Sequence, residues 1–175
     1  MARSGKSPVK QGSLRIIGGL WRGRKLTFTP ADGLRPTSDR VRETLFNWLA
    51  PSIRGARCLD LFAGSGALGF EAASRHARSV VLVERDAVAV RALRDNARLL
   101  DLPAVEVVAG DALEFLRFDK RRFDVVFADP PYEGSDHSGV LSKLVEHLAP
   151  GARVYLEGPR SLEPGEGWSV LRHLA

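Results

Sequence analysis

The 175-residue sequence is poor in sulfur, with one cysteine, Cys58, and one methionine. A lone cysteine excludes an internal disulfide and suits the reducing cytoplasm, where we expect the protein to reside. Cys58 lies in an apolar stretch, so we interpret it as a small buried side chain and not as a nucleophile. The four histidines lack the spacing of metal ligands, and we expect no metal.

The sequence also lacks a long apolar run. No stretch is long enough to span a bilayer, and the N-terminus has no apolar segment like that of a signal peptide, so we expect no membrane association. With 44% hydrophobic and 27% charged residues, the composition is that of a globular protein. We expect one main domain that acts as a monomer.

Acidic residues are absent before Asp32, and the whole chain has a net charge of +5. The cations in this N-terminal part are Arg3, Lys6, Lys10, Arg15, Arg22, Arg24 and Lys25. A basic segment of this kind favours a polyanionic partner. We expect residues 1–12 to form a flexible basic tail. Residues 13–34 alternate short apolar pieces with glycines, which predicts a small β-hairpin.

Residues 35–175 are predicted to form a single α/β domain. A first helix follows residues 35–39 and ends at Pro51, with Arg40 and Arg42 off its buried face. Strands and helices then alternate. The predicted strands span 57–62, 79–84, 104–109, 124–129 and 152–157, with a sixth near 168–171, and the predicted helices span 67–76, 86–100 and 138–149, with a helical turn after Asp111. Continuously apolar strands between helices are typical of a doubly wound, mostly parallel sheet, whose ligands bind beyond the carboxyl ends of the strands.

Two consecutive prolines mark the most informative of these strand ends. Asp129, Pro130, Pro131 and Tyr132 follow the apolar run 125–128, and the prolines stop the strand because they cannot donate to a sheet ladder. A carboxylate, a free proline carbonyl and an aromatic ring then lie close together. They suit a flat ring that carries an amino group, because two acceptors receive its hydrogens and an aromatic face stacks on it. The alternative is an ordinary loop after a strand.

A glycine-rich segment, residues 64–69, follows the first strand of the domain with the spacing G-x-G-x-x-G, and Glu84 ends the next strand. This pattern alone permits a dinucleotide. Asp60 and Asp111 favour S-adenosylmethionine: the first can hold the ammonium of a methionine moiety, and the second, with the backbone of Ala112, can accept an adenine amino group. A dehydrogenase would also need a substrate domain, for which the chain has no room. Each aspartate could instead cap a local turn.

The segments IIGGLWRGRKL, GLRPTSDRVRETLFNWL, LDLFAGSGALGFEAASR and VFADPPY, with the acid that ends the second strand, form a combined pattern. It resembles the bacterial family that methylates a guanine N2 in the 16S ribosomal RNA of the small subunit. The resemblance covers residues 13–157. It implies a Rossmann-like class I methyltransferase fold, S-adenosylmethionine as donor, and 16S rRNA as partner, within the small ribosomal subunit or an assembly intermediate.

The resemblance also implies roles for individual residues. At the donor, Asp60, Gly64, Ser65 and Gly66 would line the methionine end, Glu84 the ribose, and Asp111 with Ala112 the adenine, with Arg35 and Thr37 beside them. At the acceptor, Asp129 and the Pro130 carbonyl would hold the guanine amino group while Tyr132 stacks on the ring. On the hairpin, Arg22, Arg24 and Lys25 would touch the RNA backbone, unless Trp21 packs under the hairpin and these charges are simply solvated.

The sequence departs from the family pattern at one place: it stops at Ala175 after the predicted sixth strand, so we expect the family's antiparallel final strand to be missing. Two other functions stay open. One is methylation of an exocyclic amine on adenine N6 or cytosine N4, in DNA or another RNA, since the tetrad selects an amine and not one base. The other is a non-catalytic RNA-binding assembly factor that retains the fold.

Overall fold

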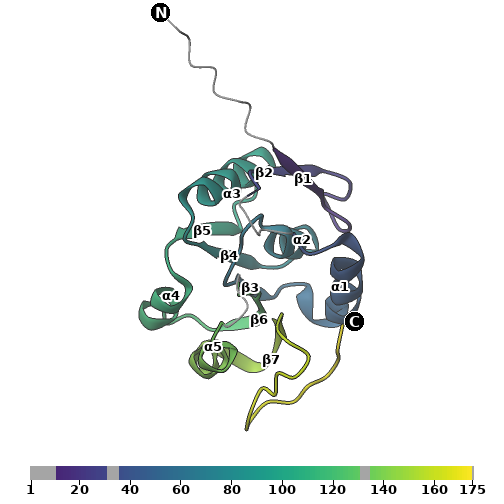
Figure 1. Ribbon diagram of the computed structural model, residues 1–175. Coiled ribbons are helices and arrows are strands. Elements are labelled where there is room, and N and C mark those ends of the chain that lie inside the picture. The colour runs from purple at the N-terminus through teal and green to yellow at the C-terminus, as the bar shows by residue number, and fades with distance from the viewer. Residues whose placement is uncertain (1–10, 31–35, 131–134, 175) are drawn as a thin grey trace, which may run out of the picture.

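The computed structural model describes residues 11–30, 36–130 and 135–174. Its centre is a five-stranded parallel sheet in the order β5-β4-β3-β6-β7 (Figure 1). The strands are β3 Arg57–Asp60, β4 Ser79–Glu84, β5 Val105–Ala109, β6 Phe123–Ala128 and β7 Leu148–Leu156. This order confirms the predicted doubly wound α/β fold.

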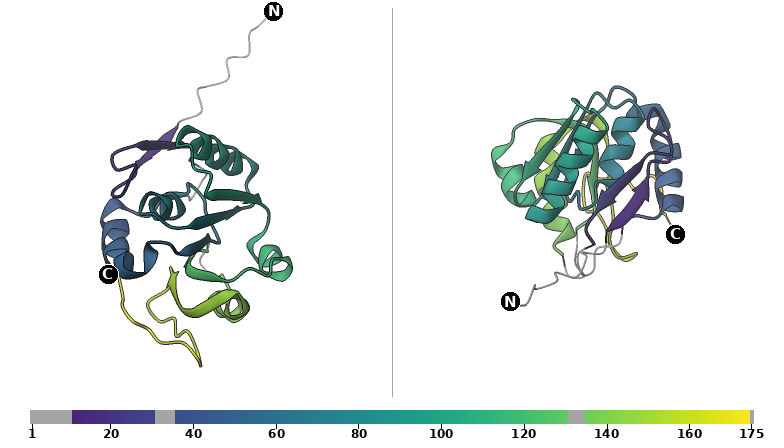
Figure 2. Two further views of the ribbon diagram at one scale, coloured as in Figure 1. Left: turned by 180° about the vertical axis from the view of Figure 1, so that it is seen from behind. Right: turned by 90° about the horizontal axis from the view of Figure 1, so that it is seen from above.

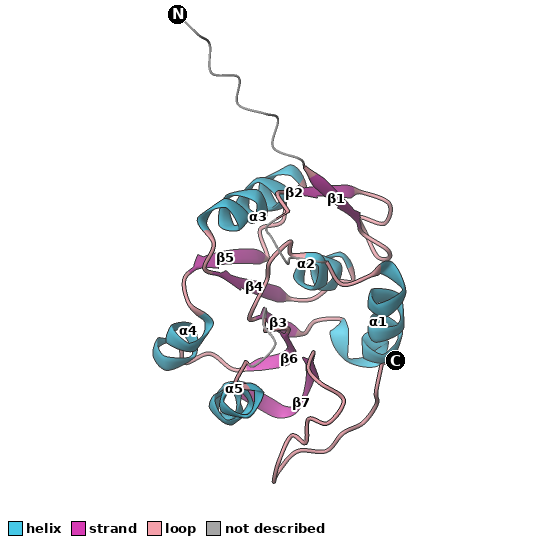
Figure 3. Cartoon of the chain, viewed as in Figure 1, coloured by secondary structure: helices cyan, strands magenta, loops and turns pink. Residues whose placement is uncertain are grey.

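Helices cover both faces of this sheet (Figures 1 and 3). On one face lie α1 Asp39–Ile53, α2 Ala67–Ser74 and α3 Ala87–Leu99, and on the other lie α4 Ala112–Phe118 and α5 His137–Leu144. Alternate strand residues therefore enter different cores: Cys58 packs with the first group of helices and Leu59 with the second. Burial on both faces explains why the strands read as unbroken apolar runs.

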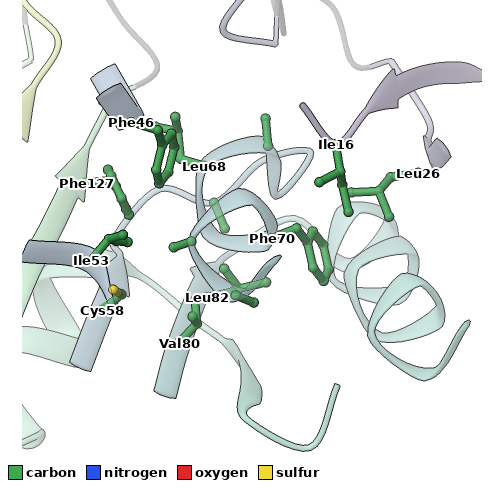
Figure 4. Close-up of a cluster of buried hydrophobic side chains, with 14 of the residues drawn as sticks. Ile16, Leu26, Phe46, Ile53, Cys58, Leu68, Phe70, Val80, Leu82 and Phe127 are labelled. Carbon is green, nitrogen blue, oxygen red and sulfur yellow. The ribbon is translucent and has the colours of Figure 1, made fainter. Parts of the chain in front are cut away.

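The hairpin predicted for residues 13–34 is a separate antiparallel ribbon of β1 Gly12–Arg15 and β2 Lys25–Phe28. It stands beside the helix layer, as Figure 2 shows. Ile16 and Leu26 are fully buried in the same core as Phe46 and Phe70 (Figure 4). The ribbon is thus part of the packed domain.

Asn96 attaches the ribbon to α3. This buried side chain donates from Nδ2 to the carbonyl of Thr27 at 2.9 Å and accepts from the same residue's N–H at 3.4 Å. The amide thus makes the two hydrogen bonds that a neighbouring strand would make, and it satisfies the N–H and carbonyl of Thr27 at the edge of β2.

A buried ion network joins the ribbon to α1 and α2. The side chain of Arg42 is 1% exposed and that of Glu71 is fully buried, 3.4 Å apart. Arg42 also donates to the carbonyl of Arg15 at 3.0 Å and to Asp39 Oδ1 at 2.6 Å. Our expectation that Arg42 lies off the buried face is therefore wrong, because the ribbon covers that side of α1.

Glu71 is the acceptor at the centre of this network. Its two oxygens receive the N–H groups of Ile17 and Gly18 at 2.9 and 2.8 Å, and Arg75 Nε donates to it at 2.9 Å. One carboxylate on α2 therefore fixes the path of the chain as it leaves β1.

Three other details differ from expectation. Helix α5 ends at Leu144, and β7 already begins at Leu148, inside the range predicted for that helix. Pro51 does not end α1, which continues to Ile53, because the buried Ile53 side chain holds the last turn. Residues 168–171 form no strand; the chain here runs back to α1, where Arg172 lies over the ring of Trp48 at 5.4 Å. Within the described part of the chain, no helix has the length and apolar character needed to cross a membrane.

Glu71→Gln should destabilise the fold by about 3–5 kcal/mol, because it leaves the buried Arg42 without its buried counter-charge. Urea unfolding followed by circular dichroism measures the effect. The control is Asp95→Asn, which breaks the exposed Asp95–Arg98 pair at 3.1 Å and should change stability by less than about 0.5–1 kcal/mol. Equal losses in the two variants would contradict a special role for the network.

Candidate functional site

The predicted glycine loop joins β3 to α2. Gly66 has φ of 81° and caps α2, and a Cβ at this position would come within 2.5 Å of Phe70 and 2.6 Å of Leu93. At Gly69, a Cβ would lie 2.1 Å from Leu82. Both glycines are therefore required by packing of α2 against the sheet and α3. A substitution at Gly66 would disturb the core and cannot serve as a clean test of ligand binding.

Asp60 ends β3 with a carboxylate that is 3% exposed. Its Oδ2 accepts the N–H of Gly69 at 3.1 Å. Burial raises the pKa of Asp60 to about 7, against the lowering effect of the Gly69 N–H, and the charges of Asp129 and Glu84 raise it further. A site that raises the pKa of a carboxyl in this way favours a cationic ligand, because a nearby positive charge would restore the ionised form.

This raised pKa also sets the sign of a stability effect. The folded protein binds the Asp60 proton more tightly than an unfolded chain, whose aspartates titrate near 3.8. The stability that Asp60 contributes is thus present at low pH and is lost as the pH rises from about 4 to 7. The buried carboxyl group therefore lowers stability at neutral pH, a property more typical of binding sites than of structural ion pairs.

Glu84, at the end of the neighbouring β4, holds the glycine loop. Its Oε2 accepts the N–H of Gly64 at 2.8 Å and its Oε1 accepts the N–H of Asp86 at 2.9 Å. Each carboxylate oxygen can accept a second hydrogen bond. The residue can therefore fix the loop and still receive two hydroxyl donors from a ribose.

Asp111 follows β5 and caps α4. Its Oδ1 accepts the N–H groups of Leu113 and Glu114 at 2.8 and 3.1 Å. The capping role that we left open is therefore real. Both bonds use one oxygen, so Oδ2 can accept a further donor such as an amine, and the buried Ala112 lies directly beside it. A role at an adenine ring stays a prediction.

Asp129 follows β6, next to β3 in the sheet, and has a second carboxylate beside it. Burial, followed by the charge and contact of Glu157, raises the pKa of Asp129 to about 6. Glu157 follows β7, and its Oε2 accepts the hydroxyl hydrogen of Tyr155 at 3.2 Å. We did not identify Glu157 or Tyr155 from the sequence. The available signal was an acid directly after an apolar strand, the same signal that identified Glu84 and Asp129.

For several other predicted site residues the structure gives only their position. Ser65 is buried in the glycine loop and Pro130 is half-buried after Asp129. Thr37 lies against the ribbon, where it lines a groove of about 370 Å³ with Arg15 and Lys25. The predicted donor contact of Arg35 and the stacking role of Tyr132 lie outside the described residues.

The three cations predicted to contact RNA are exposed. Arg22 and Arg24 lie in the loop of the ribbon and Lys25 begins β2. Trp21 instead packs partly buried against the core. The alternative that we kept for Trp21 is therefore correct for its side chain, while the role of the three charges stays a prediction. Across the described ranges, no cluster of three or more histidine, cysteine or acidic side chains is arranged to hold a metal ion.

Comparison with known proteins gives the family. Residues 14–174 match the family model described as Conserved hypothetical protein 95. The chain belongs to this family. A curated member from Haemophilus influenzae, named Ribosomal RNA small subunit methyltransferase D, is 44% identical and aligns over 95% of this chain and 91% of its own length. The Escherichia coli K12 protein of the same name is 47% identical over 87% of this chain and 79% of its own.

Solved structures agree with this assignment. A candidate methyltransferase from Escherichia coli superposes with a TM-score of 0.85 at 45% identity, covering 94% of this chain and 93% of its own. A candidate methylase from Haemophilus influenzae gives a TM-score of 0.75 at 43% identity, covering 92% and 91%. The protein is thus a Rossmann-like, class I methyltransferase that uses S-adenosylmethionine.

If Asp60 pairs with the donor's ammonium, as we predict, donor affinity should depend on pH, because only the ionised carboxyl can form this pair. As the pH falls from about 7 to 5.5, the dissociation constant should rise by up to about tenfold per unit. Isothermal titration calorimetry with S-adenosylmethionine measures this. Asp60→Asn should bind more weakly and lose the pH dependence in this range. If it keeps the wild-type dependence, another group is responsible.

Proposed function

We propose that this protein transfers a methyl group from S-adenosylmethionine to the exocyclic N2 of a guanine in the 16S rRNA of the small ribosomal subunit. The observation that carries the proposal is the position of Asp129. It follows β6, which pairs with β3, so its carboxylate stands beside the strand that leads into the glycine loop, where we expect the donor. The names of the curated relatives support small-subunit rRNA as substrate.

The described residues fit the donor at its three polar parts. Asp60 offers a buried carboxylate to the ammonium, Glu84 two oxygens to the ribose hydroxyls, and Asp111 a free oxygen to the adenine amine. They come from the ends of β3, β4 and β5, which are adjacent in the sheet. The donor supplies a sulfonium-bound methyl group, an electrophile that requires no covalent enzyme intermediate.

The chain's own contribution is to prepare the weak nucleophile. The lone pair of a guanine amine is shared with the ring, so the nitrogen is planar. If Asp129 and the Pro130 carbonyl accept its two hydrogens, the pyramidal geometry of the nitrogen is favoured, and its lone pair is then available to attack the methyl group. Holding two reactants in such a geometry contributes roughly 7–11 kcal/mol at best. The carboxylate also offsets the positive charge that develops on the nitrogen.

The ribbon offers a surface for RNA. Its described part, residues 11–30, carries four cations and no acid, and the groove beside Thr37 continues from Arg15 and Lys25 toward α1. Glu71 and Asn96 hold the ribbon in place, so its charges are pre-positioned. RNA binding here would deliver the target base from the ribbon side of the site, after the base has left its stack at a cost of about a few kcal/mol.

The test of the function is product analysis. Small subunits from a strain that lacks this protein should accept a methyl group from the purified enzyme, and nucleosides from the digested RNA should contain N2-methylguanosine. A product methylated on adenine or cytosine would contradict the base assignment. Donor binding without any transfer to these subunits would favour the non-catalytic alternative.

Asp129→Ala should reduce turnover by about 10²–10³, because it removes an electrostatic contact to the reacting amine. Donor affinity should stay near the wild-type value, since the donor carboxylates are on other strands. Single-turnover rates and calorimetry on the same preparation separate the two effects. A parallel collapse of donor binding would mean that Asp129 is structural.

Replacing Arg22, Arg24 and Lys25 together by alanine should weaken RNA affinity. The dependence of log affinity on log salt concentration should become shallower by about two to three units, because RNA binding with fewer phosphate contacts releases fewer counterions. Affinity is measured across a potassium chloride series. The control replaces Arg117, Lys120 and Lys143, which line a groove between α4 and α5 on the other face of the sheet. An unchanged slope in the ribbon variant would place the RNA elsewhere.

A further inference from the structure

Glu157 lies beside Asp129, where the paired strands β6 and β7 end. In the paired strands Phe127 is opposite Tyr155 and Ala128 is opposite Leu156, and the N–H of Glu157 donates to the Ala128 carbonyl at 3.0 Å. Side chains two residues apart on a strand share a face. Asp129 and Glu157 come two residues after Phe127 and Tyr155, and their carboxyl groups contact each other.

A hydrogen bond from Tyr155 orients the side chain of Glu157. The half-buried Tyr155 packs against the core with its ring and donates its hydroxyl hydrogen to Glu157 Oε2 at 3.2 Å. Burial, the charge of Glu157 and that of Asp129 raise the pKa of the Tyr155 hydroxyl, so this hydrogen stays in place at neutral pH. Glu157 itself is exposed, so a ligand can reach its carboxylate, and that carboxylate also contacts Asp129.

Two adjacent carboxylates distinguish the bases that carry an exocyclic amine. Guanine presents N1–H beside its N2 amino group, so neighbouring positions on this edge are both donors. Adenine presents the acceptor N1 beside its amine, and cytosine presents the acceptor N3. A carboxylate next to the amine-holding group therefore attracts guanine and repels the other two, because a carboxylate can only accept.

We propose that Glu157, oriented by Tyr155, accepts the N1–H of the target base and thereby selects guanine over adenine and cytosine. This assignment rests on the proposed function, whose acceptor site it completes. Glu157 would be a specificity residue, in contact with the base but not with the reacting amine. This role also explains why the Asp129 and Glu157 carboxylates lie beside each other, since the N2 amino group and the N1–H of one guanine would compensate both charges.

The contact is tested by exchanging the hydrogen-bonding character at N1. Once the wild-type product has located the nucleotide, 16S rRNA is ligated with either guanosine or 2-aminopurine riboside there and assembled into subunits. 2-Aminopurine keeps the 2-amino group but has an acceptor at N1. The wild-type enzyme should prefer guanosine in kcat/KM by about 10–100-fold. Glu157→Gln can donate to the acceptor N1, so the preference should fall by a similar factor.

Controls isolate the N1 contact. Glu163→Gln removes the same charge from an exposed position and should keep the wild-type preference. Tyr155→Phe should weaken the preference with donor affinity unchanged, whereas a purely structural defect would alter donor binding and melting temperature. A wild-type preference retained in Glu157→Gln overturns the assignment and leaves the proposed function intact. A wild-type product other than methylated guanine overturns both.

Discussion

The pairing of Arg42 with Glu71 is the constraint on which the other parts of the molecule depend. Two full charges are removed from water, and this is tolerated only because every nearby polar group is used: both oxygens of Glu71 accept backbone N–H groups, and Arg42 donates to two carbonyls and to Asp39. The same bonds set the path of residues 15–18 and orient α1 against α2. The basic ribbon and the helix that follows the glycine loop are thus joined by one buried network.

A second constraint is the meeting of carboxylates at one edge of the sheet. Parallel strands all end on the same side, so the acids that end β3 and β4 and those that follow β6 and β7 are brought to one edge, and two of them have raised pKa values. This concentration of negative charge is unfavourable in the free protein. In the proposed function, a ligand cation and the amine hydrogens of a base would relieve it, so the same repulsion between carboxylates would assist binding of donor and acceptor.

Much of this arrangement could be predicted from the sequence, because strand burial and strand ends leave local signals. The five parallel strands and the acids at Asp60, Glu84 and Asp129 follow from apolar runs and what terminates them. The burial of Arg42 could not be predicted, since helical periodicity describes one helix and not the ribbon packed over it. Glu157 was missed although it follows an apolar strand, because its position beside Asp129 depends on the pairing of β6 with β7, which only the strand order reveals.

The loop between β1 and β2 has the appearance of a surface segment that accepts insertions. Its backbone is nevertheless held against α2. The N–H groups of Leu20 and Trp21 donate to the carbonyl and the hydroxyl of Ser74, and a Cβ on Gly19 would lie 2.0 Å from the Ser74 carbonyl oxygen. An epitope tag grafted into this loop would pull the ribbon off the helix. A fluorescent reporter is better inserted near Gly165, where a Cβ would meet no other atom within 4 Å.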